Sequence, residues 1–189
     1  TDTRKIWRLF ARHYRLFAAT PSRMWIDHAL QDLFGLDQRL SPETADAAFD
    51  AINEKLASPA FRPRALFERF NLEVLATTES ALEDLAHHRT IRDSEWQGRV
   101  ITTYRPDAVI DPDFAGFIGN VEAFCAHGGG AVTWESYLAA HHARRAYFAS
   151  LGATATDHGH PTANTANLAQ AEAAALFDDV MTVKADPAT

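Results

Sequence analysis

Apolar residues recur at every third or fourth position through the first seventy residues of the chain, which is the spacing of one helix face. Ile6 and Leu9 begin the pattern, and a later stretch, "RMWIDHALQDLFGL", repeats it. Ser41 and Pro42 are typical of a helix start, because a capping hydroxyl precedes a proline at the first helical position. The pattern therefore predicts helices, and no strand, before residue 71.

From residue 71 onward, short runs rich in apolar and β-branched residues alternate with longer helical stretches. The runs predict strands near residues 72–78, 99–105 and 153–157, with helices over 80–94, 114–127, 133–152 and from 167 onward. Strands separated by helices are typical of parallel βαβ units, so the predicted fold class is α/β. Three strands are too few to close a barrel, and a complete (β/α)8 barrel needs about 250 residues.

The composition is that of an ordinary globular protein, and it argues against some classes of function. The 189 residues carry a net charge of −7 and no long run of lysine and arginine, which argues against a nucleic-acid partner. No apolar stretch approaches the roughly 20 residues of a membrane span. The single cysteine, Cys125, cannot form an internal disulfide and suits a reducing, cytoplasmic compartment. Because "TDTRKIWRLF" opens on a helix-like pattern without an initiator Met, we expect an internal fragment of a longer protein.

The strand predicted over 99–105 ends in a candidate binding residue, Arg105. Pro106 ends the strand, and the alternation of side chains places Arg105 on the opposite face from Tyr104. A guanidinium at the carboxyl end of a parallel strand can grip a carboxylate through two parallel hydrogen bonds. The simpler interpretation is an ion pair with Asp107 or Asp111 at the rim, and the sequence leaves both open.

Asp157, His158 and His160 follow the third predicted strand, in the stretch "ATATDHGHPTANTA". His158 could bind a metal or move a proton near neutral pH, and Asp157 could orient a neighbouring group. A divalent ion usually needs at least three protein ligands, so this stretch alone predicts no complete metal site. The simpler interpretation is a helix-entry loop whose side chains cap backbone groups.

The other histidines are expected to serve packing or to lie on the surface. The members of the pairs His87–His88 and His141–His142 point in different directions on their predicted helices. His13 and His28 are expected to be partly buried. The sequence contains no Gly-x-Ser-x-Gly elbow for serine catalysis and no phosphate-binding loop.

Several long phrases of the sequence, and the spacing between them, resemble uronate isomerase, a family also called glucuronate isomerase. The phrases are "WRLFARHYRLFAATPSRMWIDHAL", "FRPRALFERFNLEVLATTESALEDL", "GRVITTYRPDAVIDPDF" and "ARRAYFASLGATATDHGHPT". Within them, "LFERFNLEVLATTE", "TYRPD" and "ATDHG" are the most specific. Together the phrases cover nearly the whole chain.

The resemblance implies part of a (β/α)8 TIM-type barrel of the amidohydrolase superfamily, with an added helical region. It assigns residues 1–70 to the helical insertion, 71–184 to barrel strands three to five with their helices, and 185–189 to a tail. The implied activity belongs to carbohydrate metabolism. It is the reversible aldose–ketose isomerisation of D-glucuronate to D-fructuronate and of D-galacturonate to D-tagaturonate.

The resemblance also implies roles for individual residues. Arg105 matches a family arginine that binds the sugar acid, while Asp157 and His158 match the motif after the fifth strand and become the catalytic candidates. The family's main metal ligands belong to the first and last strands, so a divalent metal, with zinc expected, is held mainly outside this chain. His158 is a possible further ligand. A uronic acid is the expected partner, and the isolated chain is expected to be inactive.

Two other interpretations stay open at this point. A metal-dependent hydrolase of the same superfamily would share the fold but would act on a scissile bond. A non-catalytic fragment would instead bind partners or self-associate, because three parallel strands leave two open edges and an apolar inner surface. A homo-oligomer is therefore also expected.

Overall fold

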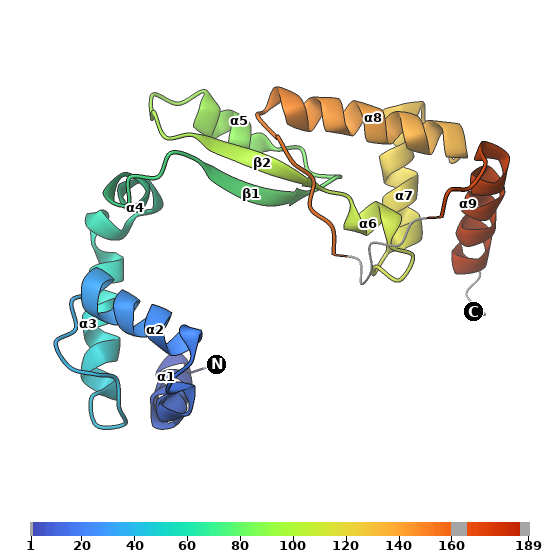
Figure 1. The fold of residues 1–189 in the computed structure, drawn as a ribbon. Helices are drawn as coiled ribbons and strands as arrows, with labels where there is room; N and C mark the ends of the chain where they lie inside the picture. Colours follow the sequence, from blue (N-terminus) through green and yellow to red (C-terminus); the bar gives the residue numbers. More distant parts are fainter. Residues whose placement is uncertain (1, 160–165, 186–189) are drawn as a thin grey trace. The chain divides into compact units, whose positions relative to one another are not determined.

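The computed structural model describes residues 2–159 and 166–185 of the chain. The chain divides into two compact units, Thr1–Leu72 and Glu73–Thr189, which are coloured from blue to teal and from green to red in Figure 1. The predicted tail at 185–189 lies outside the described residues, apart from Ala185. Among the described residues, no helix is both long and apolar enough to cross a membrane.

The first unit is helical, as predicted, and its described residues contain no strand. Its elements are α1 (Thr3–His13), the 3-10 turn η1 (Tyr14–Phe17), α2 (Pro21–His28), the π-helical turn η2 (Ala29–Leu33), α3 (Ala45–Ala57), the 3-10 turn η3 (Pro59–Phe61) and α4 (Pro63–Arg69). Alanine, leucine and tyrosine side chains form its buried core, namely Ala11, Tyr14, Leu30, Leu40, Ala45 and Ala48.

Side chains at the helix ends and between helices explain several boundaries of this unit. The Thr20 hydroxyl accepts a hydrogen bond from the Arg23 N–H and so caps α2, with Pro21 at its first position. The predicted helix start at Pro42 is wrong, because α3 begins at Ala45. The Thr44 hydroxyl accepts from the Ser41 N–H at 2.9 Å, and the Ser41 hydroxyl accepts from the Thr44 N–H at 3.3 Å, which closes a separate turn before the helix.

The second unit alternates strands and helices along the chain. Its elements are β1 (Leu75–Ser80), α5 (Ala86–Arg92), β2 (Val100–Arg105), α6 (Asp107–Ile110), α7 (Phe117–Cys125), the 3-10 turn η4 (Ala126–Gly128), α8 (Trp134–Ser150) and α9 (Gln170–Ala185). β1 and β2 pair in parallel, with a register that runs from Leu75 opposite Val100 to Ser80 opposite Arg105. This pairing confirms the predicted α/β class with parallel strands.

The third predicted strand, 153–157, is not a full strand. One parallel bridge joins Thr156 to Tyr104, formed by the Tyr104 N–H to Ala155 O and the Asp157 N–H to Tyr104 O, at 3.2 and 3.0 Å. A strand needs a ladder of such bonds, and within the described residues this segment has only this one bridge. The segment nevertheless runs beside β2 in the predicted direction.

Two further boundaries differ from the prediction. The strand expected at 72–78 is β1 at Leu75–Ser80, because its partner β2 supplies residues only from Val100 onward. The helix expected at 80–94 is the shorter α5, since Leu85 lies in the left-handed region at φ +56° and breaks the helical path before Ala86.

Helices α5 and α8 cover one face of the β1–β2 sheet, as Figure 1 shows. Tyr104 points to this face, where its ring meets Phe148 of α8 edge-on at 5.0 Å. The core of the unit continues from this contact into α7 and α9, through residues such as Val121, Phe124 and Phe177. The strands are therefore anchored to helices on one side, and that anchoring fixes where their carboxyl ends lie.

Candidate functional site

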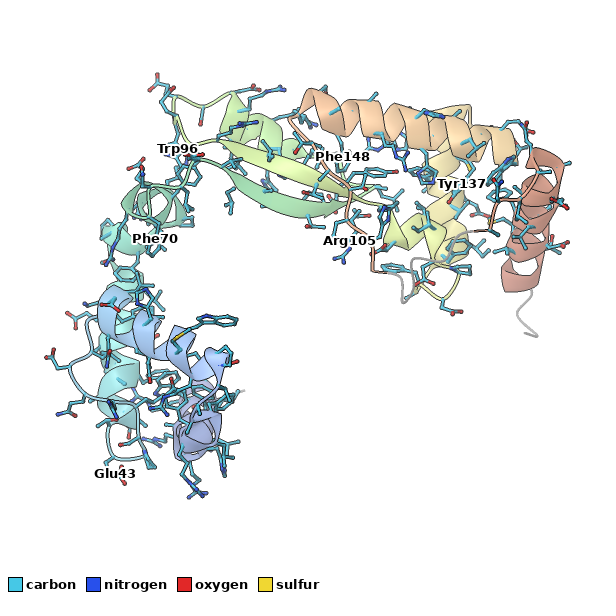
Figure 2. All side chains as sticks on the ribbon, viewed as in Figure 1. Glu43, Phe70, Trp96, Arg105, Tyr137 and Phe148 are labelled. Carbon is cyan, nitrogen blue, oxygen red and sulfur yellow. The ribbon has the colours of Figure 1, made fainter. Side chains whose placement is uncertain are left out.

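Arg105 is the last residue of β2, and its side chain lies on the opposite face of the strand from Tyr104. Thr102 and Tyr104 are buried, at 0% and 1% exposed, whereas the Arg105 side chain is 43% exposed, so the predicted alternation is confirmed. Figure 2 shows Arg105 at the end of β2, away from Phe148 and α8. Pro106 follows at once and lacks the N–H that a longer ladder would use.

Two carboxylates hold the guanidinium of Arg105. Its Nε donates to Asp107 Oδ2 at 2.8 Å, and its Nη2 lies 3.5 Å from Asp157 Oδ2. The contact with Asp107 is the ion pair that was the simpler interpretation of the sequence. Asp157 lies on the segment beside β2. Two carboxylates and one guanidinium therefore meet at the carboxyl end of the parallel strands.

A third contact ties the segment after the bridge to the end of β2. The backbone N–H of Gly159 donates to both carboxylate oxygens of Asp107, each at 3.0 Å. Asp107 thus contacts residues on either side of the site, and its side chain is only 17% exposed. From the sequence, Asp107 was expected only as a partner for Arg105. Its position in the first turn after β2 was a signal that the sequence offered. Its contact with Gly159, 52 positions away, could not be read from the sequence.

His158 lies between Asp157 and Gly159 in the chain, so its backbone is at the same end of β2 as Arg105. The residue is exposed. The structure therefore brings Arg105, Asp157 and the backbone of residue 158 to one end of β2. His160 lies outside the described residues.

The described residues do not complete a metal site. No group of three or more histidine, cysteine, aspartate or glutamate side chains among them could hold an ion. Asp107 and Asp157 are both engaged with Arg105, and a guanidinium competes with any cation for the same oxygens. Any metal at this rim would need ligands from other residues.

The remaining histidines divide between packing and solvent. In each adjacent pair one member packs and the other is exposed, as predicted. His88 is buried with its Nε2 2.9 Å from the Thr77 hydroxyl, and burial lowers the pKa of His141 to about 4. The expectation of partial burial for His13 and His28 is wrong, because both are exposed. His28 instead pairs through Nδ1 with Asp32 one helical turn away, at 2.6 Å.

Comparison with known proteins decides the family. The glucuronate isomerase family model matches residues 1–187. The chain belongs to the glucuronate isomerase family. A uronate isomerase from Rhizorhabdus wittichii is 59% identical over 180 residues, and one from Rhizobium meliloti is 54% identical over 187 residues. These matches cover 95% and 98% of this chain, but only 39% and 40% of the relatives, so the chain spans about two fifths of their length.

Solved structures of the family agree with the fold. A crystal structure of glucuronate isomerase from Caulobacter crescentus superposes with a TM-score of 0.92 at 50% identity, covering all of this chain and 40% of that one. Uronate isomerase from Thermotoga maritima gives a TM-score of 0.88 at 24% identity, which supports the fold alone. The α/β arrangement with two parallel strands is therefore part of a glucuronate isomerase structure.

Proposed function

We propose that this chain is the middle segment of a uronate isomerase, and that Arg105 binds the carboxylate of the sugar acid. The observation that carries the proposal is a fixed guanidinium at the carboxyl end of a parallel strand, in a chain that matches the glucuronate isomerase family over residues 1–187. Ligands of parallel α/β folds bind at this end of the strands. The family match favours an isomerase over a hydrolase of the same superfamily.

The complete protein in this proposal is a (β/α)8 barrel. Residues 1–70 form its helical insertion, and 71–184 supply barrel strands three to five with their helices. In the barrel the residues 153–157 become a full strand, because a further strand pairs with the edge opposite β2. That closure also removes the open edges that made self-association an alternative.

The proposed reaction is the reversible isomerisation of D-glucuronate to D-fructuronate, and of D-galacturonate to D-tagaturonate. One proton moves between C2 and C1, and a second moves between the two neighbouring oxygens, so no redox cofactor is needed. The outer edge of the Arg105 guanidinium, Nη1 and Nη2, takes the substrate carboxylate and holds the far end of the sugar acid. Asp157 and His158 lie beside it and are assigned the proton transfer.

A metal would contribute to this chemistry, with most of its ligands outside the described residues. The family is of the amidohydrolase type and is generally metal-dependent. A divalent ion, zinc being expected, would polarise the sugar carbonyl when bound. We place its main ligands on other parts of the barrel, with His158 at most a further ligand, because the described residues form no complete site.

The test is the kinetics of the full-length protein carrying Arg105→Met. The ratio kcat/KM for D-glucuronate is expected to fall about 100-fold, the loss of a charged, two-point contact. Isomerisation of D-glucose, which lacks the carboxylate, is expected to change far less. Arg92→Met is the matched control, since Arg92 also pairs through Nε with a nearby aspartate, Asp93, at an exposed position.

Two outcomes would contradict the proposal. Unchanged uronate kinetics in Arg105→Met would remove this residue from the substrate site. Cleavage of amides or esters by the wild-type protein, with no ketose formed from either uronate, would assign the fold to a hydrolase instead. The oligomeric state remains a prediction, which size-exclusion chromatography of the full-length protein with light scattering would measure.

A further inference from the structure

Asp107 receives hydrogen bonds from two segments that are far apart in the sequence. Arg105 Nε donates to its Oδ2 at 2.8 Å, and the Gly159 N–H donates to Oδ1 and Oδ2, each at 3.0 Å. Bonds from a guanidinium or a backbone N–H to a carboxylate are stronger than bonds between neutral groups. One carboxylate therefore joins the end of β2 to the segment that carries Asp157 and His158.

The backbone at Gly159 leaves little room for a side chain unless Asp107 shifts. A Cβ built on Gly159 would lie 3.0 Å from Asp107 Oδ2 and 3.6 Å from Arg105 Nη2. A contact of 3.0 Å is closer than real Cβ atoms usually make, so the carboxylate would have to shift. Glycine at this position is therefore what allows the segment to approach Asp107 closely enough for the N–H to bond both oxygens.

The two carboxylates on Arg105 differ in how firmly they hold it. Asp107 is at hydrogen-bond distance from Nε and is mostly buried, whereas Asp157 lies 3.5 Å from Nη2 and its side chain is 42% exposed. A bond at 2.8 Å is within the normal range, and a contact at 3.5 Å is beyond it. The longer contact is the one that an incoming anion can replace.

Occupation of Nε also sets the direction of the guanidinium. Arginine has several rotatable bonds, and an unrestrained side chain at the end of a strand would sample many orientations. With Nε held by Asp107, the planar group turns its Nη1 and Nη2 edge outward. In the part of the chain that the structure describes, no hydrogen bond ends on Nη1. This edge matches the two oxygens of a carboxylate.

We propose that Asp107 is a positioning residue for the isomerase. It holds Arg105 in the orientation that accepts the sugar-acid carboxylate, and it holds residues 157–159 beside it through the Gly159 N–H. The inference rests on the proposed function for the role of Arg105, but the link between Asp107 and Gly159 does not. The two parts can therefore be tested separately.

The kinetic test is a double-mutant cycle in the full-length protein, using Asp107→Asn, Arg105→Met and the double variant. Asp107→Asn is expected to lower kcat/KM for D-glucuronate about 10-fold, chiefly through KM, because substrate binding loses its oriented partner. The double variant is expected to match Arg105→Met alone, because Asp107 acts through Arg105. Asp93→Asn is the matched control, since Asp93 pairs with Arg92 Nε at 3.2 Å on the surface, and its kinetics should not change.

The structural test is amide hydrogen exchange at Gly159, which requires no activity. Exchange is expected to speed up about 10-fold or more in Asp107→Ala, where the acceptor of the N–H is gone, and to stay unchanged in Asp93→Ala. Gly159→Ala probes the same contact from the other side and should reproduce the rise in KM seen for Asp107→Asn.

The outcomes separate this inference from the proposed function. Unchanged kinetics in Arg105→Met together with faster Gly159 exchange in Asp107→Ala would reject the carboxylate clamp and leave Asp107 as the anchor of residues 157–159. Additive effects in the double-mutant cycle would overturn the claim that Asp107 acts through Arg105. Gly159 exchange that is equally slow in wild type and Asp107→Ala would overturn the claim that Asp107 holds the segment.

Discussion

The phenol oxygen of Tyr104 lies 2.9 Å from Nδ1 of His141, and this contact joins the end of β2 to the middle of α8. The rings of Phe124 and Tyr137 meet the imidazole edge-on, each with centroids 4.6 Å apart. Burial lowers the pKa of His141 to about 4 and raises the pKa of Tyr104 to about 12. Both groups are therefore neutral at pH 7, and with a neutral ring the phenol can donate to Nδ1.

The low pKa of His141 predicts a loss of stability in mild acid. The unfolded histidine binds a proton near pH 6.5, whereas the folded one does so only near pH 4. The stability that neutral His141 contributes is therefore complete above pH 6.5 and is lost as the pH falls toward 4. Well below pH 4 it changes no further. Its size is about 2 kcal/mol, after allowance for solvent screening of a partly exposed ring.

The measurement is the free energy of unfolding of the full-length protein between pH 7 and 4, compared with that of His141→Gln. The variant is expected to be less stable at pH 7, because the Tyr104 hydroxyl loses its partner, and to show a shallower fall with pH. Parallel curves for the two proteins would show that His141 is not the titrating group.

Arg144 is predicted to hold the turn after β1 in place. Arg144 is 7% exposed, and its guanidinium donates to the carbonyls of Ala81, at 2.8 Å, and Glu83. Arg144→Met is expected to lower the free energy of unfolding by about 3 kcal/mol, because both carbonyls lose their donor and that of Ala81 is buried. Arg144→Lys should restore only part of this, since one ammonium cannot reproduce the planar fork. Equal stability of the Lys variant and wild type would contradict the two-carbonyl role.

Gly128 is predicted to be irreplaceable at the contact between η4 and α8. A Cβ on Gly128 would lie 1.9 Å from Ser136 O, which belongs to the backbone and cannot move aside. Gly128→Ala is expected to cost about 3 kcal/mol of stability through overpacking. Gly119 of α7 has no described atom within 4 Å of its built Cβ, so Gly119→Ala should stabilise by about 0.5 to 1 kcal/mol. Thermal unfolding of both variants gives the comparison, and a harmless Gly128→Ala would disprove the packing argument.

In the first unit, Asp27 is predicted to contribute stability that strong acid removes. Burial by itself raises the pKa of its carboxyl, but hydrogen bonds from Arg23 and Tyr14, at 2.6 and 2.9 Å, outweigh burial and hold the pKa below its usual value of 3.8. Asp27→Asn is expected to cost about 1 to 2 kcal/mol at pH 7.

The wild-type contribution of Asp27 is present above pH 3.8 and is lost as the pH falls through the lower folded pKa. Chemical denaturation of wild type and Asp27→Asn at pH 7 and pH 3 isolates this contribution, because the effect of His141 is common to both proteins and cancels in the difference. Asp37→Asn, at an exposed position, is the control. An Asp27→Asn variant as stable as this control at pH 7 would contradict the prediction.

Local patterns in the sequence predicted what depends on local physics. The period-two pattern of β2 placed Tyr104 and Arg105 on opposite faces, because side chains of a strand must alternate, and the structure shows that the face of Tyr104 is the buried one. The Thr133 cap of α8 was also readable, since its hydroxyl serves an N–H only three residues away.

Features that depend on distant residues were not readable in the same way. The stretch 153–157 has the composition of a strand, but a ladder requires a continuous run of backbone hydrogen bonds to a neighbouring strand, and a sequence window does not contain that neighbour. Leu72 and Val74 extended the apparent strand although both are exposed, because apolar character alone does not specify a partner. The contact between Asp107 and Gly159 spans 52 positions, and no local rule links the two.

Because Tyr104 packs in the core and Arg105 is proposed to contact the substrate, β2 should tolerate two kinds of mutation differently. A substitution at one of the two positions changes either core packing or substrate contact. Substrate preference can therefore change without a loss of core packing. Deleting or inserting one residue earlier in β2 would reverse the alternation. Arg105 would then face α8, and Tyr104 would face outward. Selection should therefore protect the length of this strand more strictly than the identity of most residues in it.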